Sequence, residues 1–249
     1  MTGIRLAFSW LTVLPVWGPD DVDRRMAGRA IALAPLVGAA LGLGAAGLLW
    51  LLTTAGASAL LSGFLVVAAL ALITRGMHLD GLADTFDGLG SYGPPERARQ
   101  IMKSGGAGPF GVAAILFSVG VQAVSFAALA EAHRWFAVGL AVTVGRVVVV
   151  PACRRGLAAA PDTGFGALVA ATQRMWIGAG WTALAVLLAL FAVPGRPWLG
   201  PLVVLCAAGL SALLVRHAAR RFGGLSGDVL GAALEVSVAC AAAGFSLHA

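Results

Sequence analysis

The chain has 249 residues, of which 59% are apolar and 11% are charged, against about 45–50% and about 25% in an average soluble domain. With a mean hydropathy of +0.92, the chain has too few polar side chains to cover a water-soluble globule, and the composition also excludes collagen, coiled coils and disorder. The net charge of +6 requires no nucleic-acid partner, because membrane proteins carry such an excess as an orientation signal.

The apolar runs are long and continuous, which favours transmembrane helices over the short alternating strands of a membrane barrel. We therefore predict an all-α, polytopic helical membrane protein in which residues 1–249 form one integral membrane domain. The segment Leu6–Val16 lacks a convincing signal-peptide cleavage site, and we expect it to remain in the mature chain as an interfacial helix.

A helix needs about 20 apolar residues to cross the hydrocarbon of a bilayer. We expect about seven transmembrane helices. Six or eight remain alternatives, because several segments are short and one contains Arg146. In chain order the segments cover residues 31–52, 57–74, 111–130, 136–152, 176–193, 199–215 and 229–247.

The basic residues predict the orientation of these helices. If the N-terminus is cytoplasmic, the outer loops contain only Arg134 and Arg196. Cytoplasmic segments generally carry the excess of Lys and Arg, so we expect a bacterial inner-membrane protein with its polar motifs facing the cytoplasm. The residues on the predicted inner side are Arg5, Arg24, Arg25, Arg29, Arg75, Arg97, Arg99, Lys103, Arg154, Arg155, Arg174, Arg216, Arg220 and Arg221.

Three of the 11 acidic residues fall close together, at Asp80, Asp84 and Asp87. In a helix these carboxylates share one face, because Asp84 lies about 40° and Asp87 about 20° from Asp80. Like charges at this spacing repel one another unless a cation neutralises them, and oxygen ligands suit Mg²⁺ or Mn²⁺. A solvated acidic face at the membrane edge is the alternative. Gly81 and Gly88 each follow an aspartate, and we expect them to leave space for a ligand.

A carboxylate-bound metal usually completes its coordination with substrate phosphates, which also require nearby cations. Arg97, Arg99 and Lys103 follow the acidic block. The glycine-rich residues 103–111 are either a backbone site for phosphate or a flexible loop that leads into a helix. His78, two residues before the first aspartate, is either a ligand or a hydrogen-bonded structural group.

Further polar candidates lie on the predicted inner side, at Arg154 and near the C-terminus. Asp228 and Glu235 are seven residues apart and share a helical face, with Glu235 about two turns inside an apolar segment. An ionisable residue there is a functional candidate. Ser226 or Asp228 could equally cap the last helix. Arg146 lies within a span and requires a partner, for which Glu235 is one candidate.

The segment His78–Gly88 closely resembles the signature of the cobalamin synthases, or adenosylcobinamide-GDP ribazoletransferases. The resemblance covers most of the chain, because weaker family patterns occur in the expected order. They are Leu11–Pro15, Pro35–Gly38 with Gly42, Ile101–Lys103 with Gly108 and Gly111, and Gly224–Asp228 with Gly231, Ala232 and Glu235.

The resemblance implies a Mg²⁺-dependent membrane enzyme that joins adenosylcobinamide-GDP to α-ribazole or α-ribazole 5′-phosphate and releases GMP. The acidic block is also loosely similar to that of the CDP-alcohol phosphotransferases, which run an analogous displacement. The enzyme is expected to act within the lipid bilayer, and a homo-oligomer or a larger biosynthetic complex is open.

On this basis each candidate residue has an expected role. The general base is one of Asp84, Asp87 and Asp228, and the analogy with CDP-alcohol enzymes favours Asp87. The expected metal ligands are Asp80, Asp84 and Asp87, and the expected substrate-binding residues are His78, Lys103, Arg146, Arg154 and Glu235.

The chain departs from the family pattern after Lys103, where an acid and an arginine of many members are missing, and around Arg154, where a tyrosine is missing. Arg155, Arg97 and Arg99 are candidates to replace these groups. A polytopic transporter with an acidic cation site is the alternative function, because acids within spans mark ion pathways.

Overall fold

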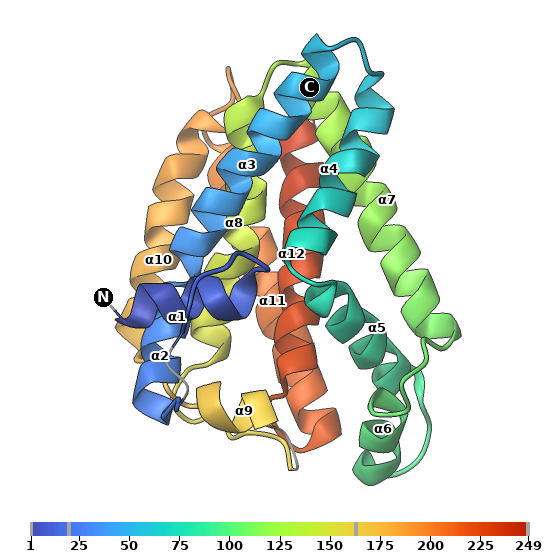
Figure 1. The fold of residues 1–249 in the computed structure, drawn as a ribbon, viewed down its shortest axis with the longest axis vertical. Helices are drawn as coiled ribbons and strands as arrows, with labels where there is room; N and C mark the ends of the chain where they lie inside the picture. The colour runs from blue at the N-terminus through green and yellow to red at the C-terminus, as the bar shows by residue number, and fades with distance from the viewer. Residues whose placement is uncertain (1, 19–20, 162–163, 248–249) are drawn as a thin grey trace.

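The computed structural model describes residues 2–18, 21–161 and 164–247, which are predominantly helical, as the sequence predicts (Figure 1). Helices α1, α2, α6 and α9 are short, with ten residues or fewer, and the other α-helices are longer. In chain order the helices are α1 (Thr2–Leu11), α2 (Arg24–Ala32), α3 (Ala34–Thr54), α4 (Ala59–Ile73), α5 (Met77–Gly90), α6 (Pro95–Met102), α7 (Pro109–Glu131), α8 (Trp135–Ala152), α9 (Gly164–Val169), α10 (Met175–Leu188) with the 3-10 turn η1 (Ala189–Phe191), α11 (Leu199–Phe222) and α12 (Gly227–Ser246).

All seven predicted spans fall on helices, and this confirms the helical membrane protein. In the described chain, five helices are long and apolar enough to cross a membrane by themselves, namely α3, α7, α8, α11 and α12. The count becomes six if the bent pair α4 and α5 is one broken span. Helix α10 is apolar but shorter, so a total of seven stays a prediction.

A sharp turn separates α4 from α5, whose axes differ by 92°. Arg75 and Gly76 both have positive φ angles, of 56° and 68°. The N–H group of Gly76 donates a 2.7 Å hydrogen bond to the carbonyl of Ala71, which closes the last turn of α4. If α4 follows the bilayer normal, α5 runs along the membrane plane, and we place α5 outside the spans.

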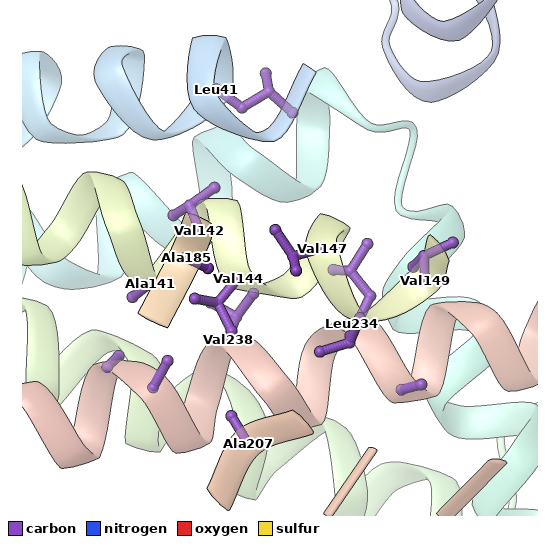
Figure 2. Packing of buried hydrophobic residues seen from close by; sticks show 14 of the residues in the cluster. Leu41, Ala141, Val142, Val144, Val147, Val149, Ala185, Ala207, Leu234 and Val238 are labelled. Carbon is purple, nitrogen blue, oxygen red and sulfur yellow. The ribbon is translucent and has the colours of Figure 1, made fainter. Parts of the chain in front are cut away.

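Helix α8 lies at the centre of the bundle, between α3 and α12 (Figure 2). Its valines, such as Val144 and Val147, are buried, and Leu234 and Val238 of α12 pack beside them. On the α3 side, a Cβ atom on Gly42 would clash with the backbone of Gly139, so the two helices touch at glycine. Small residues at such contacts let membrane helices approach and pack by van der Waals contact.

The outer helices instead expose large apolar side chains. Leu43 of α3 is 74% exposed, Phe117 of α7 is 71% exposed and Leu213 of α11 is 67% exposed. An exposed apolar surface of this extent is unfavourable in water but is the expected lining against lipid. These faces therefore mark where the hydrocarbon contacts the protein.

The polar elements gather at one end of the bundle, where α2, α6 and α9 lie, and α12 ends at the other end (Figure 1). Arg99 of α6 donates a 3.0 Å hydrogen bond to the carbonyl of Phe222, and Arg221 donates one of 3.0 Å to the carbonyl of Ser91. At the opposite end, Arg134 donates a 3.1 Å hydrogen bond to the carbonyl of Phe245. The arrangement thus separates Arg134 from the basic residues of α6 and α11.

Candidate active site

The contact between α5 and α12 brings the acidic residues together. A Cβ atom on Gly81 of α5 would lie 2.8 Å from both the Cα and the carbonyl oxygen of Asp228 of α12. One turn further along α12, a Cβ atom on Gly231 would lie 3.2 Å from the Cα of His78. The two helices therefore touch backbone to backbone, which a larger side chain at Gly81 would prevent.

This contact corrects the expectation that Gly81 and Gly88 leave space for a ligand, which is wrong for both residues. The space beside Gly81 is filled by the backbone of α12. A Cβ atom on Gly88 would lie 2.8 Å from Met102 and 3.0 Å from the ring of Phe222. Both glycines serve the packing of α5 against its protein neighbours.

The acidic residues form one electrostatic cluster at this contact. The pKa of Asp84 is raised from 3.8 to about 7, first by its partial burial and then by the negative charges of Asp80, Asp228 and Asp87, in that order. The predicted helix over Asp80–Asp87 is confirmed, and Asp228 joins its acidic residues from a segment about 140 residues later in the chain. Such a concentration of negative charge favours the binding of a cation.

Asp87 differs from its neighbours because backbone amides hold both of its oxygens. Its Oδ2 accepts a 2.7 Å hydrogen bond from the N–H of Gly108, and its Oδ1 accepts a 2.9 Å bond from the N–H of Gly111. These donors begin helix α7, so Asp87 satisfies amides that lack a partner within that helix. A Cβ atom on Gly108 would lie 2.6 Å from Oδ1 of Asp87. In this part of residues 103–111, the backbone binds a carboxylate of the protein.

A cavity of about 330 Å³ opens beside the acidic residues. Its polar lining comes from α5, α8 and α12, and most of its wall is apolar. Trp10 and Phe165 on the wall stand edge to face, with ring centroids 5.2 Å apart. The lining residues are Trp10, Leu11, Ile31, Ala34, Met77, His78, Asp80, Arg146, Val149, Phe165, Gly227, Asp228, Leu230, Gly231 and Leu234.

Two buried polar side chains in this lining have unused hydrogen-bonding atoms. Within the described chain, Nδ1 of His78 and Nε of Arg146 have no hydrogen-bond partner. Burial lowers the pKa of His78 well below 6.5, and the charge of Arg146 lowers it further, so the imidazole is neutral. Because buried polar atoms without partners are costly, both side chains are suited to bind a ligand in the cavity.

Glu235 lies deeper, beside a second and much smaller cavity that Arg146 and Gln122 also line. Its Oε2 accepts a 2.7 Å hydrogen bond from Nε2 of Gln122, which in turn lies 3.0 Å from Oγ of Ser118. Glu235 and Arg146 interact through their charges. Gln122 was not among the residues predicted from the sequence, although a polar amide within the apolar segment 111–130 is a visible signal.

The other candidates occupy different positions. Lys103 directly follows α6 as its C-cap, is exposed, and lies close enough to Asp228 for the two charges to interact. Arg154 follows α8 and does not belong to the lining of the 330 Å³ cavity. The Oγ of Ser226 accepts a 3.3 Å hydrogen bond from the N–H of Val229. Ser226 therefore caps α12, and Asp228 is not required for that role.

The cluster provides oxygen ligands but no closed metal cage. Within residues 2–18, 21–161 and 164–247, no three His, Cys, Asp or Glu side chains are arranged to hold an ion. Mg²⁺ in proteins is usually bound by one or two carboxylates together with water and substrate phosphates. The carboxylates of Asp80 and Asp84 fit that pattern, and the metal itself stays a prediction.

Comparison with known proteins gives a consistent result. A family model described as cobalamin-5-phosphate synthase matches residues 3–246. A relative named adenosylcobinamide-GDP ribazoletransferase from Corynebacterium efficiens is 40% identical over 245 residues, which cover 96% of this chain and 89% of the relative. Proteins of the same name from Frankia casuarinae and Corynebacterium diphtheriae are 41% and 35% identical, over 96% and 97% of this chain and 92% and 90% of their own. No solved structure matches.

Proposed function

Because the chain belongs to the cobalamin-5-phosphate synthase family, we propose that it is an adenosylcobinamide-GDP ribazoletransferase. It joins the cobinamide phosphate of adenosylcobinamide-GDP to α-ribazole or α-ribazole 5′-phosphate and releases GMP. The observation that carries the proposal is the acidic cluster of α5 and α12, which lies beside a largely apolar cavity.

The cavity is the site of the acceptor. Small-molecule pockets usually occupy about 300–1,000 Å³ and combine apolar walls with a few polar groups. A cavity of about 330 Å³ with Trp10 and Phe165 on its wall is of the size for a flat base with its ribose. The corrin ring of the donor is far larger, so it stays outside the cavity and only its pyrophosphate reaches the acids.

Asp228 is the residue placed to accept the proton of the attacking hydroxyl. It lines the cavity of the acceptor, whereas both oxygens of Asp87 are held by backbone amides. This assignment replaces Asp87, which we favoured from the sequence, and leaves Asp87 as a positioning residue between α5 and α7. A general base in this position contributes about 10²–10⁴-fold to the rate.

The reaction is an in-line displacement at the β-phosphorus of the GDP group. A ribose hydroxyl oxygen of the acceptor forms a bond to this phosphorus, the bond to the bridging oxygen breaks, and GMP leaves with the electron pair. Asp80 and Asp84 would hold Mg²⁺ together with the substrate phosphates, and the ion would offset the negative charge of the pyrophosphate and of GMP. Lys103 adds a positive charge beside Asp228.

The site faces the cytoplasm of the inner membrane in this proposal. Helix α5 carries the acidic block and is followed in the chain by α6, whose basic residues lie at the end of the bundle where α11 ends. Cytoplasmic ends of spans carry the excess of Lys and Arg. The pyrophosphate of the donor is charged and the ribose of the acceptor is hydrophilic, which suits a site at this surface.

The test is GMP release by purified protein supplied with adenosylcobinamide-GDP and α-ribazole, with and without Mg²⁺. We expect release to require both substrates and the metal, and Asp80→Asn to lower it by at least about 100-fold. Asp21→Asn, which removes an exposed acid outside the cluster, is the matched control and should leave release unchanged. Near-normal turnover of Asp80→Asn at low Mg²⁺ would contradict the metal assignment. Substrate flux into sealed vesicles without GMP release would instead support a transporter.

A further inference from the structure

A third cavity, on the basic end of the bundle, is lined by five arginines. It has a volume of about 460 Å³ and lies between α2 and the segment that leads from α8 to α10. Within the described chain its lining contains no acidic residue and shares no residue with the cavity of the acidic cluster. The five are Arg24, Arg25, Arg29, Arg155 and Arg174.

Hydrogen bonds between chain-distant segments build this pocket. The buried side chain of Gln173 donates from Nε2 to the carbonyl of Gly28 at 2.7 Å, and Arg24 donates from Nη2 to the carbonyl of Ala170 at 2.6 Å. On the α10 side, Nε1 of Trp181 donates to the carbonyl of Ala32 at 2.8 Å. The arginines are therefore held together by the fold and are not simply neighbours in sequence.

Among the residues that the structure describes, four of these arginines have no ion-pair partner, and the fifth, Arg24, donates to backbone carbonyls. Among described residues, the ion pair of the chain joins Arg99 to Glu96 on α6. The guanidinium groups of Arg25, Arg29, Arg155 and Arg174 form no ion pair there. Four like charges around one pocket repel each other, and an anion bound between them would relieve that repulsion. Guanidinium groups bind phosphate especially well, because their planar donors match its oxygens.

The pocket opens where the lipid-facing surface of α10 begins. Trp176, in the pocket lining, is 66% exposed, and tryptophan is enriched at membrane interfaces. Leu184 and Leu187, two to three turns further along α10, are also exposed. A phospholipid would therefore place its phosphate among the arginines and its acyl chains along the exposed apolar face of α10. Basic pockets at the cytoplasmic ends of spans are known to take such headgroups.

We propose that the five-arginine pocket binds the phosphate headgroup of an anionic phospholipid, whose acyl chains lie along α10. The lipid is bound separately from the substrates, because the two pockets share no lining residue. Its binding ties α2 to α10 and so supports the fold at the end of the bundle that also contains the acidic cluster. The proposal does not depend on the catalysed reaction.

The experiment measures binding to the full-length protein in neutral detergent with three probes, namely phosphatidylglycerol, phosphatidylcholine and inorganic phosphate. The readouts are the melting temperature and the lipid-bound mass in native mass spectrometry. We expect phosphatidylglycerol alone to bind and to stabilise, with an affinity that falls as salt rises. The double variant Arg29→Gln, Arg174→Gln should bind it about 10–30-fold more weakly. The control Arg216→Gln, Arg220→Gln removes two exposed arginines of α11 and should bind as the wild type does.

Three results would overturn the proposal. Equal binding of phosphatidylcholine would show that the headgroup charge is not recognised. Equal stabilisation by inorganic phosphate would identify a soluble anion as the ligand. An equal loss in both double variants would show a general effect of surface charge. If the pocket variant fails to fold, the lipid selectivity and salt dependence of the wild type still decide the outcome.

Discussion

The contact between α5 and α12 predicts an unusual effect of adding one methyl group. In Gly81→Ala the new Cβ would lie 2.8 Å from two backbone atoms of Asp228, whereas ordinary contacts of Cβ begin near 3.4 Å. Backbone atoms cannot rotate away, so α5 must move by several tenths of an ångström. Overpacking costs about 1–3 kcal/mol, and a clash with two backbone atoms lies in the upper part of that range, at about 2–3 kcal/mol. The helix propensity of alanine returns about 1 kcal/mol. We expect a net destabilisation of about 1–2 kcal/mol.

The assay combines thermal unfolding with GMP release. A loss of about 1–2 kcal/mol corresponds to a fall in melting temperature of about 2–8 °C for a chain of this size. Displacement of Asp80 relative to Asp228 should lower kcat by about 10–100-fold. Gly44→Ala in α3 is the matched control, because a Cβ atom there meets nothing within 4 Å. Unchanged stability and activity of Gly81→Ala would refute the backbone contact and the convergence of acids that depends on it.

Three further predictions separate the roles of the individual acids. Asp87→Asn should lower the free energy of unfolding by about 1–2 kcal/mol, because one of its two amide donors loses an acceptor. Asp80→Asn should instead lower GMP release by at least about 100-fold and leave the melting temperature unchanged. Asp84 has a pKa of about 7 and is protonated at lower pH, so the affinity for Mg²⁺ should fall by up to about tenfold per pH unit below 7 and level off above about 8. Calorimetry at about pH 6.5 should detect a proton released when Mg²⁺ binds. A flat pH profile of the affinity would contradict this prediction. Glu235→Gln should destabilise the protein by about 3–5 kcal/mol, because the buried charge of Arg146 loses its counter-charge, and Arg146→Met in the same chain should restore part of the loss in denaturant titrations.

The sequence predicts those features that depend on local periodicity. The apolar segments give the spans, and the spacing of Asp80, Asp84 and Asp87 gives a helix with its carboxylates on one face. The partner of Asp87 could not be predicted, because it is set by the approach of residues 108–111 from another helix. For the same reason the sequence suggests a ligand beside Gly81, where the fold places α12.

The pocket formed by the arginines could not be predicted from the sequence for the same reason, because it depends on contacts between distant segments. The sequence correctly assigns Arg29, Arg155 and Arg174 to one end of the spans, but it treats them only as an orientation signal. Their meeting depends on Gln173, a neutral residue whose side chain reaches the carbonyl of Gly28. No charge pattern indicates that contact, because it links two segments about 145 residues apart.

The turn at Arg75 and Gly76 explains how a membrane protein can keep so many acids close together. Ionisable residues within the hydrocarbon are costly, and a straight continuation of α4 would leave the acids of α5 in line with an apolar span. The 92° turn takes α5 out of that direction and lays it across the ends of α7 and α12. The acids then remain partly solvated, while the cavity beside them keeps the apolar wall of the spans. The turn therefore places the charged half of the site beside an apolar half that other helices supply.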